Sequence, residues 1–213
     1  MRSIFARSSQ LAGATLAATL VLVGCAPMAP NQGSYVLPPM GSNWVMARTN
    51  SGSYGAASVQ VTTSRGEQMW QGEQVASFEE PGFVQLLRAN GNLIAFLGGG
   101  KPVAIFDPEV RFSRPFEVGK TVTTNHQVTL PGRTEPMPLQ ITQKVEAYED
   151  VTVPAGTFKT FRVSWSESTG VENTYWVSPE LGITVKSILT RTAKFPSGPG
   201  KRENELVSQT IKK

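Results

Sequence analysis

The chain has 213 residues, a formal net charge of +4, one cysteine and one histidine. Residues 1–24 hold two arginines and no acidic residue, so the rest of the chain carries only +2, too little to predict binding to nucleic acid. A single cysteine excludes an internal disulfide, and one cysteine with one histidine is too few for a His/Cys metal site. We therefore predict no metal and no cofactor.

The N-terminus has the parts of an export signal. Two arginines precede an apolar run, Leu11–Val23, which has the length of a signal sequence and is short of the roughly 20 residues that a transmembrane helix needs. The run ends in Leu22-Val23-Gly24-Cys25, which resembles the lipobox of bacterial lipoproteins. The resemblance implies cleavage between Gly24 and Cys25, with palmitate-type acyl chains on Cys25 as the lipid attachment site. The alternative is an ordinary secretory signal that contains a cysteine.

The residues after the cysteine predict an anchored, tethered domain. Ala26 stands where an Asp in such lipoproteins signals retention in the inner membrane, so Ala26 favours the outer membrane and its periplasmic face. We expect residues 1–24 to form the signal peptide. Residues 25–42, which contain four prolines, form the lipidated cysteine and a flexible tether. Residues 43–213 form one β domain.

Alternation of apolar and polar residues predicts the strands. It runs through residues 57–63, 139–147, 161–165 and 183–189. Asn90-Gly91 separates two further strands, 83–89 and 92–97, and the pair predicts a type I′ hairpin. Pro and Gly are spread evenly and punctuate short strands. We predict an all-β fold: a single antiparallel β-sandwich, or a strongly curved half-barrel sheet, of about ten short strands.

Residues 107–190 resemble a group of uncharacterised proteobacterial exported proteins rich in β structure. The segments that carry the likeness are VEAYEDVTVPAGTF at 145–158, YWVSPELG at 175–182 and PFEVGK at 115–120. The resemblance implies β architecture and an envelope location. It implies no reaction, because no functional residue of the group is assigned. The same segments also have the composition of hairpin turns, with Pro154 and Gly156 at one corner.

The chain offers little for catalysis. His126, the only histidine, has the parity of Val122 and Val128, which predicts a packed imidazole rather than a general base. The glycine-rich run Leu97–Pro102 is not a phosphate-binding loop, because Ala95 stands before it where such a loop needs Gly, and Pro102 stands where it needs Ser or Thr. A glycosidase needs two acids, and six candidates exist: Glu79, Glu80, Asp107, Glu109, Glu149 and Asp150. We predict no catalytic residue.

Four aromatic residues keep a binding role open. Tyr148, Trp165, Tyr175 and Trp176 lie in the resembling region, and adjacent Tyr175 and Trp176 must point to opposite faces of a strand. Aromatic faces on a curved sheet stack on sugars or lipids, although core packing is their commoner use.

The sequence predicts a lipid-anchored cell-envelope lipoprotein with a non-enzymatic binding or structural role. We expect the protein to be attached to the membrane through its lipid anchor, and its partner to be an envelope protein, a glycan or a lipid. One alternative is a half-barrel carrier of a lipid or another apolar ligand. The other is a carboxylate-dependent hydrolase of periplasmic glycan.

Overall fold

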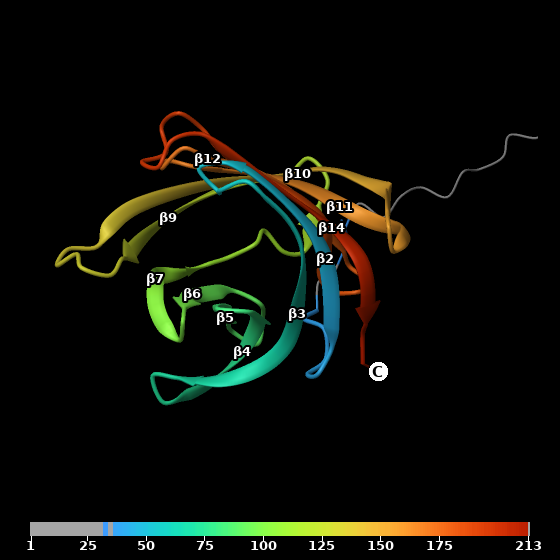
Figure 1. Ribbon diagram of the computed structural model, residues 1–213, viewed down its shortest axis with the longest axis horizontal. Coiled ribbons are helices and arrows are strands. Elements are labelled where there is room, and N and C mark those ends of the chain that lie inside the picture. Colours follow the sequence, from blue (N-terminus) through green and yellow to red (C-terminus); the bar gives the residue numbers. More distant parts are fainter. Residues whose placement is uncertain (1–31, 34–35, 213) are drawn as a thin grey trace, which may run out of the picture.

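The computed structural model describes residues 32–33 and 36–212 (Figure 1). Gly24, Cys25 and the signal segment lie outside the described residues. The strands are β1 (Gln32–Gly33), β2 (Asn43–Gly52), β3 (Ala57–Trp70), β4 (Glu73–Glu80), β5 (Phe83–Leu87), β6 (Leu93–Gly98), β7 (Lys101–Val110), β8 (Phe116–Glu117), β9 (Thr121–Thr129), β10 (Met137–Val153), β11 (Gly156–Glu167), β12 (Val171–Ser178), β13 (Ile183–Arg191) and β14 (Gly200–Thr210). No helix that could span a membrane occurs among these residues.

Twelve of the described strands form one closed antiparallel barrel. Strands that follow each other in sequence mostly pair, and the barrel closes where β14 pairs with β2, β7 with β9 and β9 with β10. The all-β, antiparallel expectation is confirmed. The sheet closes into a barrel of twelve strands, whereas the sequence predicted a sandwich or a half-barrel of about ten. Strands β3 and β10 are also long, at 14 and 17 residues. Closure joins the edge strands, which otherwise present unpaired backbone groups to other chains.

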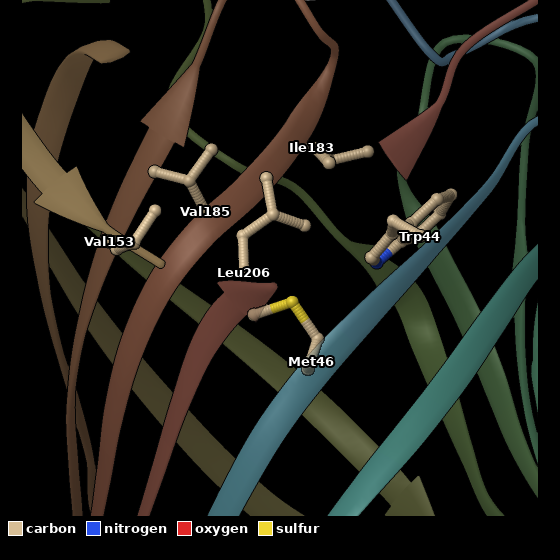
Figure 2. Packing of buried hydrophobic residues seen from close by; sticks show 6 residues of the cluster. All are labelled: Trp44, Met46, Val153, Ile183, Val185 and Leu206. Atoms are coloured by element: carbon tan, nitrogen blue, oxygen red, sulfur yellow. The ribbon is translucent and has the colours of Figure 1, made fainter. Parts of the chain in front are cut away.

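One core cluster fills the barrel where β2, β13 and β14 lie side by side. Figure 2 shows Trp44 and Met46 of β2 facing Leu206 of β14 and the β13 residues Ile183 and Val185, and Val153 of β10 completes the group. Leu206 and Val185 have no exposed surface. The ring of Phe78 meets Trp44 edge-on at 5.1 Å between centroids, an arrangement that aromatic pairs favour.

The opposite face of β4, β5 and β6 carries a second apolar cluster. Val75, Leu86, Ala95 and Leu97 are buried there, with the half-buried Trp70 packed beside them. These residues alternate with side chains that face the barrel interior, such as Phe96 between Ala95 and Leu97. The β3–β7 portion curls at the lower left of Figure 1, and its strands β4–β6 carry apolar side chains on both faces.

The Asn90-Gly91 hairpin forms, but with a different turn from the one predicted. Gly91 has φ of +79°, whereas Asn90 does not have a positive φ, and a type I′ turn needs both. The amide of Gly91 donates to the Arg88 carbonyl, and the amide of Arg88 donates to the Asn92 carbonyl. This pattern is a type I turn with a glycine bulge, which also joins β5 to β6. The Asn-Gly pair alone does not distinguish the two geometries.

Part of the segment predicted as a tether lies against the barrel. Gln32–Gly33 pairs with β8, and a side chain at Gly182 would collide with the Val36 carbonyl. Ser42 accepts a hydrogen bond from the Lys212 amide and is fully buried. The chain therefore enters the barrel beside the Trp44 end of β2.

Candidate functional site

The inward face of β2 changes character along its length. Trp44 and Met46 belong to the apolar core, but Arg48 and Asn50 continue the same face toward the loop at residues 52–57. Strands β13 and β14 change in the same direction and place Arg191 and Arg202 beside that loop. We call Arg48, Asn50, Arg191 and Arg202, with Tyr54 of the loop, the arginine end of the barrel.

Arg48 is held by a network that runs along the inward face of the barrel wall, from β4 to β13. Its two terminal nitrogens each lie 2.9 Å from a Glu80 carboxylate oxygen, in the bidentate geometry that makes such pairs strong. Its Nε donates to the Asn204 side-chain oxygen at 2.8 Å, and Asn204 donates to Ser187 Oγ at 2.9 Å. Only 16% of the Arg48 side chain and 13% of the Glu80 side chain remain exposed. Glu80 thus neutralises Arg48.

Tyr54 lies beneath two further guanidinium groups. The Cζ atoms of Arg191 and Arg202 are 3.9 and 4.6 Å from the centre of its ring, within the range of cation–π contacts. Arg191 also donates to the Ser53 carbonyl at 3.0 Å and lies 4.5 Å from the Phe195 ring centre. These contacts hold the two arginines in fixed positions.

The arginine end has an excess of positive charge. The ion pairs of the described residues include a carboxylate for Arg48 but none for Arg191 or Arg202. Asn50, a neutral residue, accepts from Arg202 Nε at 2.9 Å. Burial, and then the nearby Arg48 guanidinium, hold the pKa of Arg202 below its ordinary value. An anion placed here would relieve the repulsion between the three arginines.

Two open hollows lie on the outer face of the barrel wall. One, of about 450 Å³, is lined by hydroxyl side chains of β9–β13 that include Thr142, Ser166 and Thr190. The other, of about 670 Å³, adjoins it around Asn125 and Gln140. Their outward-facing lining is mostly neutral and hydrogen-bonding. It has neither the charge excess nor the aromatic contacts of the arginine end.

His126 takes the place that its alternation predicted. It is 4% exposed, its Nδ1 lies 2.7 Å from the Pro108 carbonyl, and its Nε2 lies 2.7 Å from Thr124 Oγ1. Both ring nitrogens are therefore engaged in hydrogen bonds within the barrel wall. Among the described residues, no three His, Cys, Asp or Glu side chains gather as metal ligands would.

Four of the six candidate carboxylates are paired with cations. Their partners are Arg48 for Glu80, Arg88 for Glu109, Arg162 for Glu149 and Lys159 for Asp150. Glu79 instead accepts from Gln68 and Ser77 on the opposite face of β4 from Glu80, and Asp107 is exposed. The hydrogen bond from Asn92 lowers the pKa of Glu109, whereas a general acid needs a raised pKa.

Three of the four singled-out aromatic residues face the interior. Tyr148 packs on Phe161, and Trp165 and Tyr175 contact each other and Phe112. Burial raises the pKa of the Tyr175 phenol, whose oxygen accepts from Asn173. Trp176 has the opposite parity, as predicted, and donates to Glu149 at 2.9 Å. None of the four belongs to the arginine end.

The sequence reasoning missed the arginine end, although one signal was present. Arg48 and Asn50 follow Trp44 and Met46 at intervals of two, so charge appears on the parity of core residues. That pattern indicates either a buried ion pair or a functional site. Arg191 and Arg202, however, meet Tyr54 only because β14 pairs with β2, which lies far earlier in the sequence.

No family model and no curated protein matches this chain. Three solved structures align over most of its length. A candidate lipoprotein from Parabacteroides distasonis (TM-score 0.42, 10% identity) and a candidate exported protein with a YmcC-like fold from Bacteroides fragilis (0.43, 11%) each cover 84% of this chain with 99% of their own. The hypothetical lipoprotein YmcC from Escherichia coli (0.39, 13%) covers 81% of this chain with 89% of its own. Likeness at this level assigns neither family nor function.

Proposed function

We propose that the protein is a lipid-anchored lipoprotein of the cell envelope that binds, without catalysis, a ligand bearing an anionic phosphate or carboxylate group at the arginine end. One observation carries the binding role: Arg191 and Arg202 share the ring of Tyr54 and have no carboxylate in the described ion pairs. Arginine is the residue best suited to these groups, because its planar fork matches their oxygens.

The direction of β2 supports the combination of anchor and site. The described chain enters the barrel at the Trp44 end, and the arginine end lies at the other end of the ten-residue strand. At about 3.3 Å per residue the two ends are roughly 30 Å apart. Lipid on Cys25 would hold the Trp44 end nearer the membrane and leave the arginine end facing the periplasm. We propose the periplasmic face of the outer membrane for the reason that Ala26 gives.

The anchor is tested by metabolic labelling. Radiolabelled palmitate should enter the parent protein and not Cys25→Ser, because the hydroxyl cannot form the thioether. Equal labelling of the two would disprove the lipoprotein assignment.

The binding role is tested by thermal melting in inorganic phosphate, compared with chloride at equal ionic strength. A ligand at 100 times its Kd stabilises the native state by about 2.7 kcal/mol, which raises Tm measurably. Arg202→Gln should abolish the phosphate-specific rise. Lys201→Gln is the matched control, since Lys201 adjoins Arg202 in β14 but faces outward and pairs with Glu203. An equal phosphate-specific rise of Tm in Arg202→Gln and Lys201→Gln, or no such rise in the parent protein, would refute the binding role.

A further inference from the structure

Beside the arginine end, the inward face carries a row of phenylalanines. Phe83 of β5 lies directly across the ladder from Glu80, the carboxylate partner of Arg48. The rings of Phe83 and Phe96 are 5.4 Å apart, and Phe106 follows Phe96 at the same distance. We call Phe83, Phe96 and Phe106 the phenylalanine row. It begins beside the charged network and ends across from Val128 of β9.

The phenylalanine row is not sealed into the core. All three rings are only half-buried, unlike Leu86 and Ala95 on the opposite face of the same strands, which have no exposed surface. Val59, which lies opposite Arg48 on the inward face, is 48% exposed. Solvent therefore reaches this face, and aromatic surface in contact with water is a favourable partner for an apolar chain.

The arginine end and the phenylalanine row lie next to each other on the inward face. The guanidinium groups lie at the end of β2, and the phenylalanine row starts where the Arg48–Glu80 pair ends. A ligand with an anionic group at one end and a hydrocarbon chain behind it would satisfy both. Neither an inorganic anion nor an uncharged hydrocarbon would contact more than one of the two surfaces.

We infer that the ligand of the arginine end is an anionic amphiphile, a phosphate or carboxylate bearing an acyl or alkyl chain, with its head on Arg191 and Arg202 and its chain along the phenylalanine row. This inference rests on the proposed anion-binding role and adds the chemistry of the rest of the ligand. The same head and chain occur in a free fatty acid and in a phospholipid.

The test is a chain-length series measured by titration calorimetry on the full chain: inorganic phosphate, methyl phosphate, butyl phosphate and octyl phosphate below its aggregation concentration. Each fully buried CH₂ contributes about 0.8 kcal/mol, close to fourfold in affinity. Octyl phosphate should therefore bind at least tenfold more tightly than methyl phosphate. Octanoate and a short-chain phosphatidylglycerol, run beside it, distinguish a free carboxylate from a phospholipid source.

Two variants test whether the increase in affinity with chain length comes from the phenylalanine row. Phe96→Ala should reduce the octyl-over-methyl gain at least threefold and leave the affinity for methyl phosphate unchanged, while Phe158→Ala, away from the phenylalanine row, should change neither. Phe96→Leu, which keeps most of the apolar volume, serves if the alanine variant does not fold. Arg202→Gln should weaken every member of the series.

The outcomes separate the two proposals. Phosphate binding that gains nothing with chain length overturns the amphiphile inference and leaves the anion-binding role intact. An absence of binding for every member overturns both. Tight binding of octyl phosphate that is insensitive to Arg202→Gln and Phe96→Ala places the ligand elsewhere and overturns the inference.

Discussion

The inward face of β2, β13 and β14 has two ends of opposite chemistry: one is apolar and buried, and the other is charged. At one end Trp44, Met46 and Leu206 interlock with Val185 and Ile183 in a dry cluster. At the other, Arg48, Arg191 and Arg202 bring three guanidinium groups together against one carboxylate. The apolar end lowers the free energy of the fold. The arginine end concentrates like charge, which lowers the stability of the fold, and we propose that this charge serves to bind an anion.

The apolar end should be the most sensitive to truncation. Leu206→Ala removes a side chain with no exposed surface, and such changes typically cost 2–5 kcal/mol. Urea unfolding should show a loss in this range. Met69→Ala, at a residue 68% exposed, should change stability by less than about 0.5 kcal/mol. A loss below 1 kcal/mol for Leu206→Ala would mean that this cluster does not form the core.

Breaking the one ion pair of the arginine end should come next in size. Glu80→Gln leaves the Arg48 side chain, which is only 16% exposed, without its anion, and we expect a loss of about 2 kcal/mol in the unfolding free energy. Replacing both partners by Glu80→Leu and Arg48→Met should recover much of that loss, because no buried charge remains. A double variant as unstable as the sum of the two single variants would show that the pair is not coupled.

Removing an unpaired arginine should cost far less. Arg202→Gln loses the contact with Tyr54 but also a desolvated cation, so its unfolding free energy should lie within about 1 kcal/mol of the parent. Chemical denaturation measures this directly. A loss as large as that of Leu206→Ala would make Arg202 a structural residue and erase the contrast between the two ends.

The smallest effect belongs to the hydrogen bond from Asn92 to Glu109, which lies away from both ends. Because hydrogen bonding from Asn92 lowers the pKa of Glu109 when folded, its contribution is present above the unfolded value of 4.5 and is lost as pH falls through the folded pKa. Asn92→Ala should therefore destabilise by about 1 kcal/mol or less at pH 7, and the difference should shrink at low pH. A difference independent of pH would exclude the carboxylate as its cause.

The sequence predicted local features better than the closure of the sheet. Alternation placed Val163 and Trp165 on one face and identified Trp176 as facing away from Tyr175, because period two depends only on neighbours. It did not predict that β14 pairs with β2, since the same alternation occurs in sandwiches, open sheets and barrels. The Tyr54 contacts were unpredictable for the same reason: they depend on pairing between residues more than 130 positions apart.

The most direct test of the contrast between the two ends is an NMR titration with octyl phosphate that follows the arginine side-chain Nε–Hε signals and the methyl groups of the apolar end. The anion-binding proposal predicts saturable shifts for Arg191 and Arg202, with little change at Leu206 and Ile183. Shifts confined to the outer hollow around Thr142 and Ser166, or no saturable shift of either arginine, would contradict it.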